Sequence, residues 1–279
     1  MLVVDTPAEM RGWSRDHRSA SRRVALVPTM GALHAGHHSL IEQATQLADV
    51  VAVSIFVNPM QFNRRDDFDT YPRPLDDDLA ECQRLGVDAI YAPTAATMYP
   101  VGFDTAVEPG ALADVLEGAQ RPGHFRGVTT VVSKLFHAVE PDVAVFGQKD
   151  FQQLAIIRRM VTDLDMGVEI VTAPTVRETD GVALSSRNRR LTDQQRAAAV
   201  CVPRSLRAVT ELHERGERRV DVLVAAGRAV VDAEPLARFE HLEVVDVDTL
   251  ASLSNVDRPA VAVTAVWFGD VRLIDNALL

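Results

Sequence analysis

Cysteine is nearly absent from this chain of 279 residues, which contains only Cys82 and Cys201. Two cysteines so far apart in the sequence match neither a disulfide framework nor a cysteine-rich metal motif, and they favour a reducing cytoplasmic location. The chain also lacks any apolar run that approaches the roughly 20 residues of a membrane-spanning helix. Its N-terminal residues do not combine a charged segment with an apolar one, so we expect no secretory signal.

Basic residues are in the minority, because 29 Lys and Arg face 39 Asp and Glu and the formal net charge is −10. Nucleic acids and anionic membrane surfaces attract basic faces, so we expect neither as a general partner. Apolar residues make up 47% and charged residues 24% of the sequence, which is ordinary for a globular protein. The length allows one large domain or two modest ones, each with its own core.

Short apolar runs alternate with amphipathic segments over the first two-thirds of the chain. The runs predict strands at Val24–Val27, Val50–Val57, Val87–Ala92, Val143–Phe146 and Val168–Thr172. The amphipathic segments predict helices at about Ser39–Ala48, Leu75–Leu85, Val128–Ala138 and Phe151–Asp163. Nearly continuous apolar strands between such helices predict an α/β fold, in which a parallel sheet is covered on both faces. Ligands of these sheets bind at the carboxyl ends of the strands.

The pattern changes after Pro174. A helical segment at Thr192–Arg215 contains Pro203, which we expect to kink or break the helix near Val202. A second helix and three short strands follow, at Val220–Val231, Leu242–Val247, Val261–Phe268 and Val271–Ile274. Gly269-Asp270 between the last two strands predicts a hairpin. These elements indicate a smaller α+β domain, so we predict two domains, at residues 1–175 and 176–279.

Two histidines near the first of these strands form the most informative pattern. The strand Val24–Val27 is followed by Pro28 and Gly31, and His34 and His37 then come at the start of a helical segment. Backbone N–H groups at a helix start attract anions, and imidazoles there can donate hydrogen bonds to phosphate oxygens. Alternatively, the histidines are capping or surface residues. Zinc binding is a third option, but no cysteine or third histidine lies nearby at ligand spacing. The run H-A-G-H matches the HIGH-like signature of nucleotidyltransferases, which lies at this junction in a Rossmann-like fold.

Amide side chains follow the second predicted strand, in the run Asn58-Pro59-Met60-Gln61. The proline takes the chain out of the sheet, which leaves Asn58 and Gln61 near the end of the strand. Amides donate and accept without carrying charge, so they suit the recognition of a small polar molecule. The structural alternative is a turn-forming Asn-Pro pair with a solvated glutamine.

A lysine follows the fourth predicted strand, in the run Gly147-Gln148-Lys149-Asp150. A cation at the start of a helix opposes the helix dipole, so Lys149 requires a compensating anion such as a phosphate. Gln153 lies one helical turn beyond Lys149 and can point to the same side. Gly147 permits a ligand to approach the backbone closely.

Three further polar runs have a functional and a structural explanation. The run Asp76–Asp78 can complement the dipole of a helix or supply oxygen ligands to Mg²⁺, and the structural explanation is the simpler one. The basic run Arg121–Val128 can lie over an anion or form a solvated connection. Two hydroxyls and a guanidinium at Ser185–Arg187 can clamp a phosphate, although such a run also occurs by chance.

Six blocks along almost the whole chain resemble the pantothenate synthetase family. They are P-T-M-G-A-L-H-x-G-H, S-I-F-V-N-P-x-Q-F, Y-P-R, R-P-G-H-F-x-G-V, F-G-x-K-D-x-Q-Q-L and S-S-R-N. The resemblance implies a Rossmann-like domain that binds ATP and pantoate, a smaller C-terminal lid domain, and a homodimer. It also implies that ATP, with Mg²⁺, drives the condensation of pantoate with β-alanine through a pantoyl adenylate. AMP and pyrophosphate are the other products.

The same resemblance implies roles for particular residues. Catalytic roles fall to His34, His37, Lys149, Ser185 and Arg187. Contacts to ATP or to the other substrates fall to Met30, Gly31, Asn58, Gln61, Gly147, Asp150, Gln153, Val176, Leu184 and Ser186. Within this set, Gln61 and Gln153 are expected to hold pantoate, and Lys149 to neutralise phosphate charge. No protein ligand of Mg²⁺ is assigned, because the phosphates of ATP and water are expected to hold most of the ion.

Two other functions stay open at this point. Another HIGH-type enzyme, such as a cytidylyltransferase or a pantetheine-phosphate adenylyltransferase, would lack the N-P-x-Q-F and F-G-x-K-D-x-Q-Q-L blocks. A non-catalytic nucleotide-binding regulator would have no need of transition-state groups such as His34, His37, Lys149 and Arg187.

Overall fold

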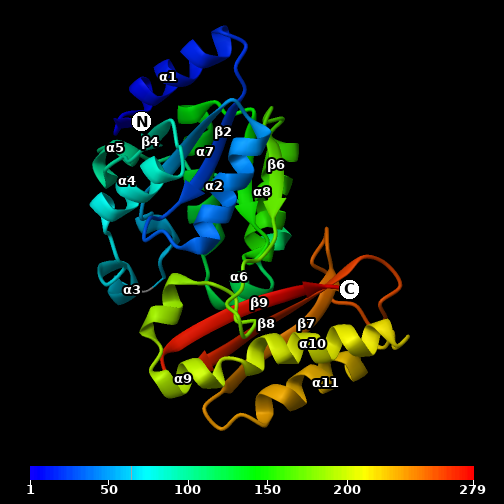
Figure 1. Ribbon diagram of the computed structural model, residues 1–279. Helices are drawn as coiled ribbons and strands as arrows, with labels where there is room; N and C mark the ends of the chain where they lie inside the picture. Colours follow the sequence, from blue (N-terminus) through cyan, green and yellow to red (C-terminus); the bar gives the residue numbers. More distant parts are fainter. Residues whose placement is uncertain (64) are drawn as a thin grey trace. The chain divides into compact units, whose positions relative to one another are not determined.

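Figure 1 shows a computed structural model of the chain, which describes residues 1–63 and 65–279. The chain divides into two compact units. The N-terminal unit comprises Met1–Gln148 and Gln152–Pro174, and the C-terminal unit comprises Lys149–Phe151 and Thr175–Leu279. The short segment Lys149–Phe151 therefore groups with the C-terminal unit, although it is flanked in the sequence by elements of the N-terminal unit.

The N-terminal unit contains the predicted parallel sheet. Its strands are β1 (Leu2–Val4), β2 (Val24–Thr29), β3 (Val50–Ile55), β4 (Ala89–Tyr91), β5 (Val143–Gly147) and β6 (Glu169–Ala173). They lie in the order β1-β4-β3-β2-β5-β6, and every neighbouring pair is parallel. The prediction of an α/β fold with a parallel sheet is confirmed. Strand β1 was not predicted, because a run of three residues carries too little periodicity to be recognised.

Helices cover both faces of this sheet (Figure 1). They are α1 (Pro7–Ser19), α2 (Ala35–Leu47), α3 (Arg65–Asp69), α4 (Leu75–Arg84), α5 (Ala95–Met98), α6 (Leu116–Gln120), α7 (His124–Val139) and α8 (Phe151–Asp163), with 3-10 turns η1 (Pro59–Gln61) and η2 (Ala111–Ala113). Successive strand residues point to opposite faces. Val27 of β2 accordingly packs in one cluster with Ile41 of α2, whereas Leu26 packs in another with Phe136 of α7.

The order of the strands determines where a ligand can bind. From β2 the chain proceeds to β3 and β4 on one side, and it returns to β5 and β6 on the other side. The direction of winding therefore reverses between β2 and β5. In open parallel sheets, the crevice beyond the carboxyl ends of the strands at such a reversal is the usual binding site. The carboxyl ends of β2 and β5, at Thr29 and Gly147, lie at this reversal.

The C-terminal unit combines helices with an antiparallel sheet. Its strands β7 (Arg238–Asp246), β8 (Ala260–Phe268) and β9 (Val271–Leu278) lie in sequence order. Its helices are α9 (Asp193–Ala198), α10 (Cys201–Glu214) and α11 (Val220–Asp232), with the 3-10 turn η3 (Ser186–Arg190). Helices α10 and α11 run along the sheet (Figure 1). The hairpin predicted at Gly269-Asp270 joins β8 to β9, and Gly269 has the positive φ of 59° that the turn requires.

The predicted helix break near Val202 is placed too late. Helix α9 ends at Ala198 and α10 begins at Cys201, so Pro203 lies in the first turn of α10. A proline is tolerated there because the first backbone N–H groups of a helix have no intrahelical acceptor.

Both cysteines are buried and free. Burial raises the pKa of each thiol to about 12. In the part of the chain that the structure describes, no helix combines the length and apolar character needed to cross a membrane.

Two helical glycines are expected to respond oppositely to an added methyl group. A Cβ at Gly227 of α11 would lie 2.7 Å from Leu242 Cδ1 and 2.9 Å from Val209 Cγ2, whereas nothing lies within 4 Å at Gly12 of α1. We predict that Gly227→Ala lowers the free energy of unfolding by about 1–3 kcal/mol through overpacking. Gly12→Ala should raise it by up to about 1 kcal/mol through helix propensity. Urea unfolding measures the stability of both variants. If the two substitutions changed the free energy of unfolding equally, the close packing around Gly227 would be contradicted.

Candidate active site

The two histidines meet at the turn after β2. His34 is the N-cap of α2, and its Nδ1 accepts a hydrogen bond from the N–H of Gly36 at 3.1 Å. The Nδ1 of His37 accepts from the N–H of His34 at 3.3 Å, and the two ring centroids are 4.1 Å apart. Because each Nδ1 is an acceptor, each neutral ring carries its proton on Nε2. The site thus holds two neutral Nε2–H donors at a helix N-terminus, which suits a phosphate.

A buried carboxylate shapes the turn that leads to these histidines. Asp78, in the first turn of α4, is 3% exposed and accepts the N–H groups of Ala32 and Leu33, both at 2.8 Å. Gly31 has a φ of 78°, and a Cβ on it would lie 2.7 Å from Asp78 Oδ2. The sequence favours compensation of the helix dipole as the role of Asp76–Asp78. It gives no sign that Asp78 also bonds to Ala32 and Leu33, because these residues lie more than 40 positions earlier in the chain.

The amides after β3 form a closed set of hydrogen bonds. Asn58 is 1% exposed, and its Nδ2 donates to Gln61 Oε1 at 3.1 Å and to the carbonyl of Gly127 at 3.0 Å. Its Oδ1 accepts from the N–H of Met60 at 3.2 Å and from the hydroxyl of Tyr99 at 2.7 Å. Burial raises the pKa of Tyr99 above its ordinary value, so the phenol keeps the proton that it donates. Asn58 therefore orients Gln61.

Gln61 is held from several directions. Its Nε2 contacts Met30 Sδ at 3.1 Å, which brings together the segments after β2 and β3. The main-chain carbonyl of Gln61 accepts hydrogen bonds from His124 Nδ1 at 2.7 Å and from Arg121 at 3.2 Å. Part of the basic run Arg121–Val128 thus fixes the main chain beside Gln61.

A glycine allows α7 to approach η1 closely enough for these contacts. A Cβ on Gly127 would lie 2.4 Å from the carbonyl oxygen of Met60 and 2.7 Å from the nitrogen of Gln61. Any larger residue at this position would push the turn that carries Gln61 away from α7.

The two glutamines at the start of α8 have different surroundings. Gln152 is 5% exposed, and its amide bonds to the N–H of Glu117 at 2.9 Å and to the carbonyls of Leu112 and Val115 at 2.8 Å. It therefore ties down the segment before α7. Gln153 is half-buried and is the glutamine that the sequence predicts as a pantoate ligand.

Three of the predicted catalytic residues lie together in the C-terminal unit. Lys149, Ser185 and Arg187 line one recess that opens to solvent, and Asn188 and Arg272 also line it. Ser185 is the N-cap of η3, and its Oγ accepts the N–H of Arg187 at 3.2 Å. The cationic side chains and the hydroxyl suit an anionic ligand.

The charges around this recess are partly compensated. The ammonium of Lys149, whose side chain is 18% exposed, lies 3.7 Å from Asp150 Oδ1, which is beyond hydrogen-bonding distance. Arg272 donates to both oxygens of Glu240, at 2.9 and 2.6 Å. Burial tends to raise the pKa of Glu240, but the hydrogen bonds and charge of Arg272 hold it below its ordinary value.

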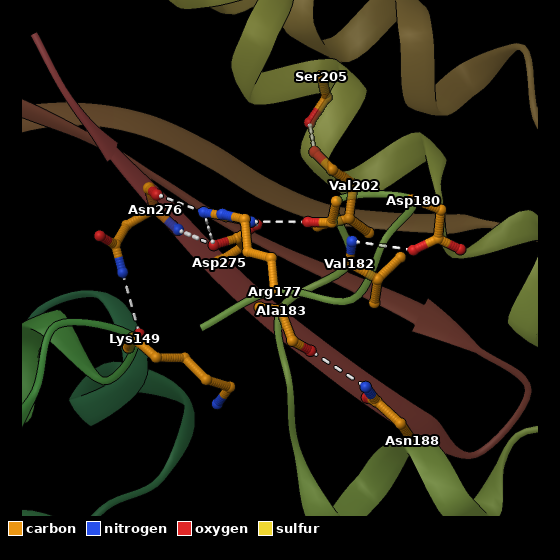
Figure 2. Close-up of polar contacts among 11 residues, drawn as sticks. Lys149, Arg177, Asp180, Val182, Ala183, Asn188, Val202, Ser205, Asp275 and Asn276 are labelled. Atoms are coloured by element: carbon orange, nitrogen blue, oxygen red, sulfur yellow. Dashed lines mark hydrogen bonds and ion pairs between the residues drawn. The ribbon is translucent and has the colours of Figure 1, made fainter. Parts of the chain in front are cut away.

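Val176, Leu184 and Ser186 lie in the segment that leads into η3 and at the start of η3. The N–H of Leu184 donates to the carbonyl of Val176 at 2.9 Å, so these two residues lie side by side. Ser186 begins η3. Arg177 pairs with the buried carboxylate of Asp275, and this pair anchors the segment to β9 (Figure 2).

No group of three or more His, Cys, Asp or Glu side chains that could hold a metal ion occurs within residues 1–63 and 65–279.

A parallel α/β sheet with an H-x-x-H turn beside its reversal point is the arrangement of the HIGH-type nucleotidyltransferases. A family model for pantoate-beta-alanine ligase matches residues 2–278. The chain belongs to this family, and it is an enzyme of the ligase type.

Individual relatives agree with this assignment. The chain is 48% identical to the pantothenate synthetase of Moorella thermoacetica, over 100% of this chain and 99% of the relative. The pantothenate synthetase of Thermus thermophilus superposes with a TM-score of 0.93 at 45% identity, covering 99% of each chain. The ligase of Francisella tularensis, solved with beta-gamma ATP and β-alanine, has a TM-score of 0.78 at 34% identity, covering 100% of this chain and 97% of that one.

Asp78→Asn tests the support of the histidine turn. The amide can accept only one of the two N–H groups at good geometry, so a buried donor loses its partner. We predict a fall of about 1–3 kcal/mol in the free energy of unfolding of the N-terminal unit. The exposed neighbour provides the control, since Asp77→Asn should change stability by no more than about 0.5 kcal/mol. Equal stability of the two variants in urea unfolding would refute the role of Asp78.

Proposed function

We propose that the chain condenses pantoate with β-alanine at the expense of ATP, through a pantoyl adenylate. The pairing of His34 and His37 as Nε2–H donors at the N-terminus of α2 is the observation that carries the proposal. Membership in the pantoate-beta-alanine ligase family supports it, as does a family member solved with beta-gamma ATP and β-alanine.

In the first step, a carboxylate oxygen of pantoate attacks the α-phosphorus of ATP, and the bond to the β-phosphate breaks. Pyrophosphate leaves with the electron pair of that bond. The two imidazoles donate hydrogen bonds to the phosphate oxygens on which negative charge grows, and their fixed Nδ1 bonds orient them before the reaction begins. Lys149 and Arg187 neutralise the triphosphate and the leaving pyrophosphate, and the hydroxyl of Ser185 donates a hydrogen bond to them.

Gln61 and Gln153 are proposed to hold pantoate through its hydroxyls and carboxylate. Neutral amides suit this role, because they orient the carboxylate without protonating it. Asn58 was predicted to contact a substrate, but its amide bonds to protein partners, so we propose that it acts indirectly by fixing the side chain of Gln61. Met30 and Gly31 would line the ATP site beside the histidines, and Gly147 and Asp150 would contact the adenosine side. Val176, Leu184 and Ser186 complete the proposed contacts.

In the second step, the amine of β-alanine attacks the acyl carbon of the adenylate. An amide bond forms, AMP leaves with the electron pair of the acyl–oxygen bond, and the amine releases a proton. Neither step requires a side-chain nucleophile, so positioning and charge stabilisation account for catalysis.

We further propose that ATP binds as its Mg²⁺ complex, with the ion held mainly by phosphate oxygens and water. Residues 1–175 would bind ATP and pantoate, and residues 176–279 would act as the lid. A homodimer and a cytoplasmic location remain part of the proposal, by analogy with the family.

The direct test measures the products of each step. With MgATP and pantoate, the protein should release pyrophosphate, and the addition of β-alanine should produce sustained AMP and pantothenate. Other nucleotides should replace ATP poorly, which separates this enzyme from a cytidylyltransferase. Folded protein that binds ATP without pantoate-dependent release of pyrophosphate would exclude the proposed reaction and favour a regulator.

A histidine variant can separate catalysis from helix capping. Asparagine is an effective N-cap, so His34→Asn should keep the hydrogen bond to Gly36 while it loses the Nε2–H donor. We predict that kcat/KM falls by about 10²–10³-fold, as for the loss of one preorganised donor. Stability should stay near that of the unsubstituted protein, whereas His34→Ala should also lose about 1 kcal/mol through the missing cap. Full activity of His34→Asn would rule out the donor role.

A further inference from the structure

Two adjacent polar residues of β9 are both buried. Asp275 is 3% and Asn276 is 2% exposed. Strand β9 pairs with β8 alone in its sheet, and consecutive residues of a strand point to opposite faces. Buried polar groups must be hydrogen-bonded, so each of these residues needs partners on its own side of the strand.

Asp275 finds its partner in Arg177. The guanidinium donates to Asp275 Oδ2 at 2.6 Å and to Oδ1 at 2.9 Å, a two-pronged pairing that fixes both groups. Asp275 Oδ1 also accepts the N–H of Asn276 at 2.8 Å, and Arg177 approaches the carbonyl of Asn276 at 3.5 Å. The ion pair therefore holds the main chain of Asn276 at its N–H and at its carbonyl.

Asn276 reaches the main chain of Lys149. Its Nδ2 donates to the carbonyl oxygen of Lys149 at 3.0 Å, across 127 residues of sequence (Figure 2). This bond agrees with the grouping of Lys149–Phe151 in the C-terminal unit. The side chain of Lys149 lines the same recess as Ser185 and Arg187.

We propose that Asn276 is a positioning residue for Lys149. The Arg177–Asp275 pair fixes Asn276, Asn276 fixes the carbonyl of Lys149, and the ammonium is thereby held beside Ser185 and Arg187. The inference rests on the proposed function, in which Lys149 binds the phosphates of ATP. It assigns a role to a residue near the C-terminus that none of the six sequence blocks contains.

Two substitutions of Asn276 test the hydrogen bond. Asn276→Ala removes the donor, and Asn276→Asp keeps the size of the side chain but places an oxygen opposite the carbonyl of Lys149. Each should weaken the binding of MgATP by about tenfold, the effect of one lost hydrogen bond to a positioned group. The KM for β-alanine should change less than twofold. Calorimetry on the full chain measures the ATP affinity, and urea unfolding checks that each variant is folded.

A control in the same unit removes a comparable bond elsewhere. The Oγ1 of Thr210 donates to the carbonyl of Arg207 at 3.0 Å, and neither residue lines the recess. Thr210→Ala should therefore leave the ATP affinity unchanged, whatever its effect on stability.

A double-mutant cycle decides whether Asn276 acts through Lys149. In the Lys149→Ala background, Asn276→Ala should weaken ATP binding by less than twofold. The positioning role of Asn276 would be overturned if Asn276→Ala weakened ATP binding equally with and without Lys149→Ala, or if Asn276→Asp kept the ATP affinity. Either result would leave the proposed function untouched. If Lys149→Ala itself leaves ATP affinity and turnover intact, the proposed role of Lys149 fails, and the inference fails with it.

Discussion

The contact between the Asp78 carboxylate and the turn after β2 is the interaction on which the histidine site depends. The turn places Gly31 and Ala32 at positive φ, 78° and 51°, and alanine adopts that region only when its surroundings enforce it. Asp78 supplies that enforcement by accepting two consecutive N–H groups. The chain then enters α2 with His34 as its N-cap. One buried carboxylate therefore holds the strained turn from which the chain enters α2.

The two units contribute different chemistry. In the N-terminal unit, neutral imidazoles and amides are fixed by hydrogen bonds to the backbone and to each other. In the C-terminal unit, lysine and arginine side chains line the recess with a serine. Neutral amides can hold a carboxylate without protonating it, and a recess lined by cations suits an anionic ligand.

Much of the fold could be predicted from local patterns in the sequence. The apolar runs of β2, β3 and β5 and the hairpin at Gly269-Asp270 can each be recognised from a few consecutive residues. The three strands form the middle of the parallel sheet, where the candidate site lies. The features that were missed depend on distant partners. Asp78 resembles any acidic helix start, and the adjacent polar pair Asp275-Asn276 gives no sign that one residue meets Arg177 and the other Lys149. Such contacts are decided by tertiary packing.

The tautomer of the two histidines is the central claim, because it makes Nε2–H the donor at the phosphate site. Long-range ¹H–¹⁵N spectra of histidine-labelled protein near neutral pH report the proton position on each ring, and His34→Asn and His37→Asn assign the signals. The structure predicts that both rings are neutral, with the proton on Nε2. A proton on Nδ1 of either ring, or a fully protonated imidazolium, would contradict the hydrogen bonds that define the turn.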